Sequence, residues 1–137
     1  AALNGAELVV VPFCAPAYVL SPQATNAPAQ IGEGAVDPAL WDLRWQSLMV
    51  TRAVENGVYL APCNHAGREM DALFRGGSMV VDPNGRILAR AEGEEGVIWA
   101  DLDREVVRQA RIQNPPRRDR RPDLYKPIVT EMDDLSL

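Results

Sequence analysis

Cysteines and long apolar runs are scarce in this sequence, and their scarcity excludes several classes of protein. Two cysteines, Cys14 and Cys63, stand among 137 residues, which is too few for a disulfide framework. No apolar run approaches the roughly 20 residues needed to cross a bilayer. No basic segment followed by an apolar one opens the chain as a secretion signal would. These absences favour a reduced, cytoplasmic protein that does not enter a membrane.

Basic residues and histidine are also few. Lys and Arg total 14 against 19 Asp and Glu, so the net charge is -5, and His65 is the only histidine. An acidic balance argues against nucleic acid as a partner. The basic run at residues 117–121 lacks interleaved aromatic residues, and we interpret it as a solvated or subunit-bridging segment. Cys63 and His65 have no third and fourth ligand at a convincing spacing, so the sequence predicts no metal site and no cofactor.

What remains is the composition of an ordinary globular domain. Apolar residues make up 47% of the chain and charged residues 24%. A chain of this length can bury a core of its own. We expect one domain over residues 1–126, followed by an extended or disordered acidic tail over residues 127–137.

Residues 37–64 are the stretch around which the rest can be placed. Asp37 is a suitable N-cap, and Pro38 occupies the first helical position, where its missing N–H costs nothing. Asn56 and Gly57 tolerate the left-handed conformation that ends a helix, and residues 58–61 continue as a strand. The helix has two neighbouring apolar faces, one with Leu40, Leu43, Val50 and Val54 and the other with Trp41, Trp45 and Leu48. So wide an apolar surface predicts burial against more than one partner.

The other elements follow from apolar runs and turn chemistry. The unbroken apolar run at residues 7–12 predicts a central strand covered on both faces. The other regular elements that we expect are a helix end at residues 1–5, strands at 78–81, 86–90 and 97–100, and a helix from Asp101 or Asp103 to about Ile112. The segments between them are a long connection at 13–36, a polar loop at 65–75, a tight turn at 82–85 and an extended segment at 117–126. Together they predict an α/β protein of the α+β sandwich type, in which a mixed sheet of about five strands carries two helices on one face. Its other side has no obvious cover, and a chain that begins within a helix end suggests a missing upstream part.

Cys14 has a reactive side chain and lies where a nucleophile or a substrate contact would be expected. It follows a strand at the start of the long connection, and α/β sheets bind ligands at the carboxyl ends of their strands. A nucleophilic cysteine needs a base or a positive charge nearby, and His65 is the only histidine available. Two readings stay open. Cys14 is either a small buried residue that lines the loop, or it forms a thiol hydrolase pair with His65.

Arg52 and Glu55 are charged residues on a helix that should be largely buried. Either could act as an acid or a base. Buried charges must be paired, so a structural pair that also satisfies loop backbone is the alternative. Gly76 and Gly77 do not form a phosphate loop, since no lysine and no helix follow; we interpret them as allowing close backbone approach.

Several short motifs, taken in order, resemble the nitrilase superfamily of carbon–nitrogen hydrolases. They are residues 5–8 leading to Pro12, residues 52–57, Asn64 with Gly67, residues 74–78, residues 82–85 and residues 119–125. The resemblance implies a four-layer αββα sandwich in the complete protein, of which residues 1–126 would be the C-terminal half. It also implies hydrolysis of small-molecule amide, nitrile or N-carbamoyl substrates at non-peptide C–N bonds by a Glu-Lys-Cys triad without a metal.

None of the three catalytic residues matches a position in this chain. The sequence around Cys14 and Cys63 differs from the motif of the family's nucleophile. The resemblance therefore implies that the triad lies upstream and that the chain is inactive in isolation. It makes Phe13, Cys14 and Ala15 candidates for substrate contacts. It makes the remaining candidates, Arg52, Glu55 and Asn64, structural residues near the pocket.

Two hypotheses from different classes compete with each other. In the first, the chain is a portion of a carbon–nitrogen hydrolase and forms sheet and pocket wall. In the second, it is a truncated, non-catalytic relative that acts as a self-associating interaction module. Homo-oligomerisation is expected from the uncovered side of the sheet and from the basic C-terminal segment.

Overall fold

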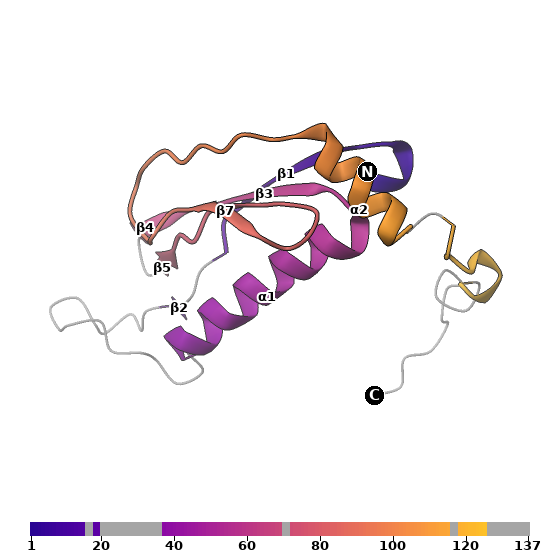
Figure 1. The fold of residues 1–137 in the computed structure, drawn as a ribbon. Helices are drawn as coiled ribbons and strands as arrows, with labels where there is room; N and C mark the ends of the chain where they lie inside the picture. Colours follow the sequence, from indigo (N-terminus) through magenta and orange to yellow (C-terminus); the bar gives the residue numbers. More distant parts are fainter. Residues whose placement is uncertain (16–17, 20–36, 70–71, 116–117, 126–137) are drawn as a thin grey trace, which may run out of the picture.

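A computed structural model describes residues 1–137 with the exception of 16–17, 20–36, 70–71, 116–117 and 126–137 (Figure 1). The regular elements are η1 (Ala2–Asn4), β1 (Leu8–Phe13), β2 (Tyr18–Val19), α1 (Pro38–Asn56), β3 (Tyr59–Asn64), β4 (Ala66–Glu69), β5 (Ala72–Arg75), β6 (Met79–Val81), β7 (Ile87–Arg90), α2 (Arg104–Gln113) and η2 (Pro122–Leu124). None of these helices combines the length and the apolar character needed to cross a membrane. The expected tail at 127–137 lies outside the described residues.

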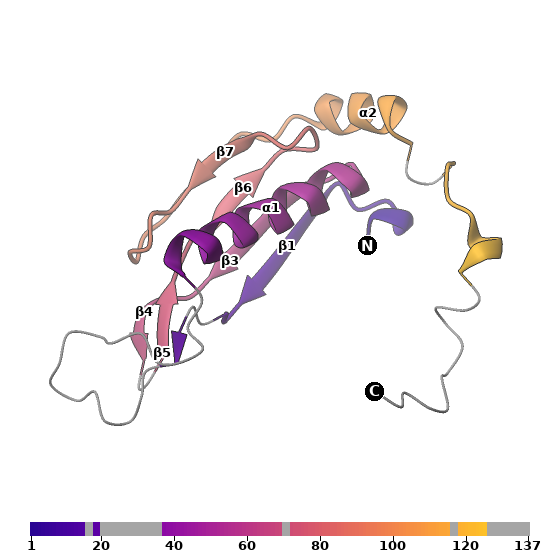
Figure 2. The same cartoon turned by 90° about the horizontal axis from the view of Figure 1, so that it is seen from below.

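The strands form two sheets that meet end to end (Figure 2). The larger has the order β1-β3-β6-β7, with β1 and β3 parallel and the other neighbours antiparallel. The smaller has the order β2-β5-β4 and is antiparallel. Because β4 begins two residues after β3 ends, the small sheet continues from the carboxyl end of β3. The mixed sheet and the two α-helices confirm the predicted fold class.

Helix α1 forms because its two ends are strongly specified, and it lies along one face of the larger sheet (Figure 2). The Asp37 carboxylate accepts a hydrogen bond from the Ala39 N–H at 2.9 Å, which confirms the predicted N-cap. Gly57 ends the helix at φ 56° and ψ 50°, the left-handed conformation expected there. The side chains that pack on the sheet are Trp45, Met49 and Ala53, and they meet Leu60, Met79 and Val81 in the core.

The opposite face of the larger sheet is open along β1, although Tyr59 of β3 is buried on it. Side chains alternate along β1, so Val9, Val11 and Phe13 face α1 and pack against the core. Leu8 and Val10 point the other way and remain 42% and 58% exposed. Strand β1 is therefore an edge strand with one bare face, and the prediction of a central strand covered on both faces is wrong. An unbroken apolar run identified the strand correctly but could not show which of its two faces the described residues cover.

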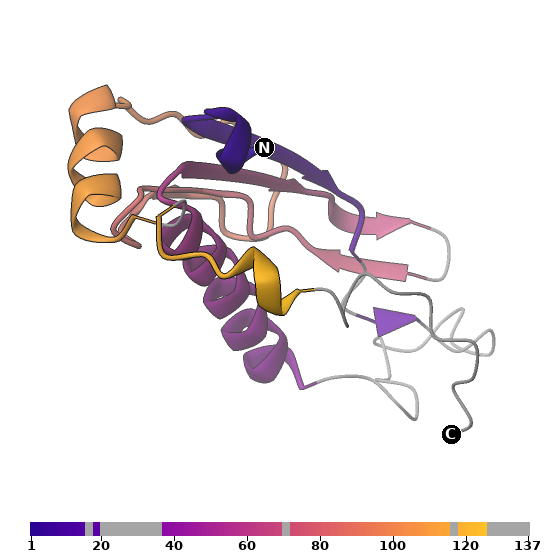
Figure 3. The same ribbon diagram turned by 90° about the vertical axis from the view of Figure 1, so that its right-hand side faces the viewer.

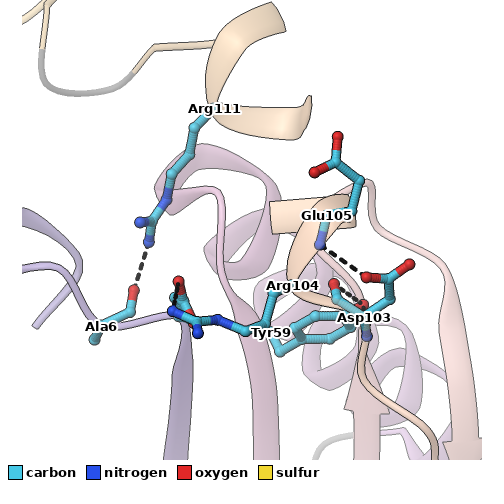
Figure 4. A network of polar contacts seen from close by, with 7 residues as sticks. Ala6, Tyr59, Asp103, Arg104, Glu105 and Arg111 are labelled. Carbon is cyan, nitrogen blue, oxygen red and sulfur yellow. Dashed lines mark hydrogen bonds and ion pairs between the residues drawn. The ribbon is translucent and has the colours of Figure 1, made fainter. Parts of the chain in front are cut away.

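Helix α2 crosses one end of the sheet, next to the start of β1 and β3 (Figure 3). Asp103 is its N-cap, one of the two residues predicted to begin this helix, and its buried residues are Val107 and Ala110. Arg111 donates to the carbonyls of Gly57 (2.9 Å) and Ala6, which ties α2 to the end of α1 and the start of β1 (Figure 4). The expectation that both helices share one face is wrong, because these polar ties hold α2 at the sheet end.

The other differences between the predicted and the observed elements depend on pairing between residues that are distant in the sequence. Residues 97–100 form no strand; they have no pairing partner among the described residues, and Val97 and Trp99 are 91% and 80% exposed. The expected polar loop at 65–75 contains β4 and β5, and the connection at 13–36 contains β2. The expected extended segment at 117–126 includes the short helix η2. The turn at 82–85 is confirmed, since the Gly85 N–H donates to the Asp82 carbonyl at 3.0 Å.

Candidate functional site

The carboxyl ends of β1 and β3 lie side by side where the two sheets join. Phe13, the last residue of β1, is paired with Asn64, the last residue of β3. The next residue, His65, donates its backbone N–H to the Phe13 carbonyl at 3.3 Å. Parallel strands bring their carboxyl ends to one edge of a sheet, which is where α/β proteins place ligands. This edge is therefore the candidate site.

Asn64 joins three chain segments at this edge. Its Oδ1 accepts from the Ala15 N–H at 3.0 Å. Its Nδ2 donates to the Gly76 carbonyl at 2.9 Å and to the Ala15 carbonyl at 3.4 Å. The side chain is buried, with 9% of the residue exposed, so these bonds replace water for an amide group that would otherwise be costly to bury.

Ser78 secures the backbone of Asn64 in turn. The Ser78 Oγ accepts from the Asn64 N–H at 2.9 Å and donates to the Asn64 carbonyl at 3.2 Å. The preceding Gly76 and Gly77 have φ values of 64° and 77°, and a Cβ on Gly77 would lie 3.1 Å from the Trp45 indole nitrogen. The interpretation of the glycine pair as a close backbone approach is thus confirmed. No sequence pattern indicated this role of the Ser78 hydroxyl, because a serine before a strand has many uses.

The three residues proposed to contact substrate are arranged differently from one another. The Phe13 ring packs edge-on against Trp45, with 5.0 Å between ring centroids, on the face covered by α1. Cys14 is exposed, and Ala15 is partly buried and held by Asn64. Cys14 is therefore not the buried loop residue of the first reading. Contact of these residues with a substrate stays a prediction.

The structure does not join Cys14 to His65. The His65 ring stands edge-on to Phe74 with 4.5 Å between centroids, and its Nε2 lies 3.5 Å from a Glu69 carboxylate oxygen. No hydrogen bond links Cys14 and His65 within the described ranges. The thiol hydrolase reading thus lacks the contact that it needs. Among these same residues, no three His, Cys, Asp or Glu side chains gather as a metal site would require.

Arg52 and Glu55 are not brought to this edge. They form an ion pair of 2.6 Å one turn before the end of α1, and their side chains are 60% and 44% exposed. The end of α1 leads into the start of β3, whereas Asn64 ends that strand. The two residues pair with each other, and they are neither buried nor next to Asn64. Arg52 borders an apolar hollow of about 330 Å³ between α1 and β1.

An open hollow of about 360 Å³ lies beside Asn64. Its lining consists of Asn64, His65, Ala66, Gly76, Ser78, Ala91, Glu94, Glu95 and Gly96. Sequence reasoning treated residues 92–96 only as an acidic turn. Their approach to Asn64 follows from the return of β7 beside β6, which no local pattern reveals.

Several groups with shifted pKa values lie at the other end of the sheet. A bidentate hydrogen bond from Arg104 lowers the pKa of the Glu7 carboxyl, with N–O distances of 2.8 and 3.0 Å (Figure 4). Arg108 and Gln109 together lower the pKa of Glu105 to about 2. The Tyr59 hydroxyl accepts from the Asp103 N–H and donates to its carbonyl, both at 3.1 Å. The contacts of Arg104 and Asp103 fix the start of α2 to the sheet, whereas those of Glu105 lie within the helix, and all of them are structural.

Known proteins resemble this chain in sequence. The model of the carbon-nitrogen hydrolase family matches residues 1–112. A 2-oxoglutaramate amidase of Bacillus subtilis is 41% identical over 81 residues, covering 59% of this chain and 31% of that protein. An omega-amidase of Saccharomyces cerevisiae is 40% identical over 103 residues, covering 73% of this chain and 35% of that protein. The chain thus spans about a third of the length of these curated relatives.

Solved structures agree with the sequence matches. A carbon-nitrogen hydrolase from Helicobacter pylori superposes with a TM-score of 0.76 at 28% identity, covering 95% of this chain and 43% of the other. An amidase from Nesterenkonia has a TM-score of 0.61 at 29% identity, covering 94% of this chain and 37% of the other. The narrower prediction that the chain is a C-terminal half is not borne out by these matches. The family is shown: this chain belongs to the carbon-nitrogen hydrolases of the nitrilase superfamily.

Proposed function

We propose that this chain is part of an amidase that hydrolyses the C–N bond of small-molecule amides, and that its catalytic glutamate, lysine and cysteine lie outside these 137 residues. Family membership supports carbon–nitrogen hydrolysis, and the names of the relatives favour amides over nitriles and N-carbamoyl compounds. The name of the Bacillus relative specifies a particular substrate, 2-oxoglutaramate.

The observation that carries the proposal is the incomplete surroundings of Cys14. A cysteine nucleophile needs a partner that lowers its pKa or takes up its proton. Within the described part of the chain, no acid, base or cation forms a hydrogen bond or ion pair with Cys14. Its side chain is exposed directly after the end of β1. We infer that the reacting groups come from elsewhere and that this chain supplies a wall of the pocket.

In the proposed reaction the nucleophilic cysteine attacks the amide carbon, the glutamate moves protons, and the lysine stabilises the tetrahedral intermediate. Those roles are carried over from the family resemblance. The contribution of this chain would be binding and orientation. The exposed edge at Cys14 and Ala15 would face the substrate, and Asn64 would hold that edge in place.

The test compares two proteins in an ammonia-release assay with 2-oxoglutaramate. The 137-residue chain alone is expected to show no turnover. The complete protein that contains it is expected to release ammonia, and Cys14→Ala in that protein is expected to keep measurable turnover. Turnover by the chain alone that disappears with Cys14→Ala would overturn the proposal, since Cys14 would then be the nucleophile.

The exposed apolar residues favour a second candidate, a non-catalytic module that self-associates. Val10 is 58% exposed on the open sheet face, and Leu43 is 64% exposed on α1. Such surfaces mark contacts with other layers or chains. A complete protein without amidase activity that still forms stable oligomers would favour this candidate. The proposed cytoplasmic location is tested by fractionation of the source cells.

A further inference from the structure

We propose that Asn64 is a positioning residue that sets the backbone at Cys14 and Ala15 and so shapes the substrate wall at the end of β1. This inference rests on the proposed function, because it assigns a residue to the same site. It goes further by identifying the group that holds the wall and by predicting how its loss changes catalysis.

The bonding pattern of Asn64 differs from that of an ordinary strand residue. Its side chain forms two hydrogen bonds with Ala15, one to the N–H and one to the carbonyl, after β1 has ended at Phe13. Such a pair mimics the contacts of a neighbouring strand. It therefore continues the pairing of β1 beyond its last strand residue, with an amide side chain in place of backbone.

The backbone on both sides of Cys14 is held, while its side chain is exposed. His65 binds the Phe13 carbonyl before it, and Asn64 binds Ala15 after it. A residue fixed at both flanks presents its exposed atoms in a defined place at little further entropy cost. The arrangement suits a substrate wall, where a shift of about an ångström weakens binding.

The position of Asn64 is determined by contacts on its other side. Its Nδ2 donates to the Gly76 carbonyl, and Ser78 bonds both of its backbone groups. These contacts belong to the approach to β6, which is packed in the core through Met79. Asn64 thus links the packed core to this edge through its side-chain hydrogen bonds. Among the described residues, no other side chain forms a hydrogen bond to the backbone of residues 13–15.

The first experiment measures amide hydrogen exchange by NMR in the 137-residue chain. Asn64→Ala is expected to speed exchange of the Ala15 amide about tenfold, as loss of one buried hydrogen bond would. Amides of Val9 and Val11, which lie in the β1–β3 ladder, are expected to stay unchanged. Unchanged Ala15 exchange would overturn the proposal. So would an equal acceleration at all three amides, because Asn64 would then only stabilise the fold.

Two further variants keep the test decisive if Asn64→Ala does not fold. Asn64→Asp retains an acceptor for the Ala15 N–H but sets a carboxylate oxygen against the Gly76 and Ala15 carbonyls, so Ala15 is expected to exchange faster than in the unaltered chain. Ser78→Ala leaves the Asn64 side chain in place and is expected to speed Ala15 exchange less than Asn64→Ala does. Asn56→Ala is the matched control, because Asn56 bonds only the Arg52 carbonyl at the far end of α1. Ala15 exchange that stays slow in Asn64→Asp, or that becomes fast in the control, would count against the proposal.

The second experiment uses the complete amidase and separates KM from kcat with 2-oxoglutaramate. Asn64→Ala is expected to raise KM about fivefold with kcat within about twofold, the pattern of lost substrate binding. An unchanged KM would make Asn64 structural only and overturn the proposal. If the unaltered protein releases no ammonia, the proposed function fails, and the Ala15 exchange rate alone decides whether Asn64 anchors this edge.

Discussion

The two faces of the four-stranded sheet are built from the same strands, yet along β1 only the face toward α1 is packed against the core, and the other face is open. On the α1 face, Met79 and Val81 are 1% and 0% exposed. On the other face, Val10 is 58% exposed although its type is just as apolar. Alternation along a strand supplies apolar side chains to both faces, and burial depends on which layer is available. The difference teaches that the same apolar strand is buried on the face that α1 covers and exposed on the face that no described element covers.

The strongest test of this comparison removes apolar volume from each face. Met79→Ala is expected to lower the free energy of unfolding by about 3 kcal/mol, since it opens a cavity under α1. Val10→Ala is expected to lower it by less than about 1 kcal/mol, because more than half of Val10 is already in water. Urea unfolding of the isolated chain measures both. Equal losses would mean that a layer also covers the open face.

A second test concerns the close approach of α1 to the glycine pair. Gly77→Ala is expected to cost about 2 kcal/mol, because φ is 77° and the new Cβ would press on Trp45. The matched control is Gly96→Ala, on the open segment, where no atom lies within 4 Å of the added Cβ and no positive φ is present. That control is expected to change stability by no more than about 0.5 kcal/mol. Similar losses in both variants would contradict the close packing at Gly77.

A third test asks whether the open face holds the protein together as an oligomer. Val10→Lys places a charge in the middle of that face, and it is expected to shift the chain to a smaller species in size-exclusion chromatography. Gln113→Lys adds the same charge at an exposed position of α2 and should leave the elution volume unchanged. A stable monomer of the unaltered chain at high concentration would count against homo-oligomerisation.

The smallest expected effect is a pH dependence of the unfolding free energy that arises from Glu7, at the end of the sheet next to α2. The Arg104 hydrogen bond lowers the pKa of Glu7 below 4.5 in the folded state. The hydrogen bond therefore stabilises the folded state fully above about pH 4.5. This stabilisation is lost as the pH falls through the pKa that Glu7 has in the folded state. Glu7→Gln should reduce the loss of unfolding free energy between about pH 6 and pH 3. Identical pH profiles for the two proteins would show that the exposed pair contributes nothing.

Local chemistry predicted much of the fold. Asp37 and Gly57 fixed the ends of α1, Asp103 fixed the start of α2, and the turn at 82–85 formed as expected. Each depends on contacts within a few residues, which the sequence displays directly. The expected strand at 97–100 failed for the opposite reason. A strand requires a partner, and the pattern of Val97 and Trp99 cannot show that none is present among the described residues.

The candidate site was only partly visible in the sequence. Position after a strand was enough to single out Cys14, and the family resemblance singled out Phe13, Ala15 and Asn64. The bonds from Asn64 to Ala15 and Gly76 join residues 49 and 12 positions apart, so no local pattern predicts them. The same limit applies to Arg52 and Glu55, since a helix reveals its charged pair but not which end of the sheet it meets; their place near a pocket stays a prediction.

By itself, the sequence determined where the helices begin and end, which strands are apolar, and the resemblance to carbon-nitrogen hydrolases. Those properties follow from caps, turns and short motifs, which act over a few residues. Only the tertiary structure decided that β1 lies at an edge, that one sheet face stays open, and that Asn64 holds the end of β1. These depend on which distant segments meet, and a chain settles that by burying its apolar surface and pairing its polar groups as a whole.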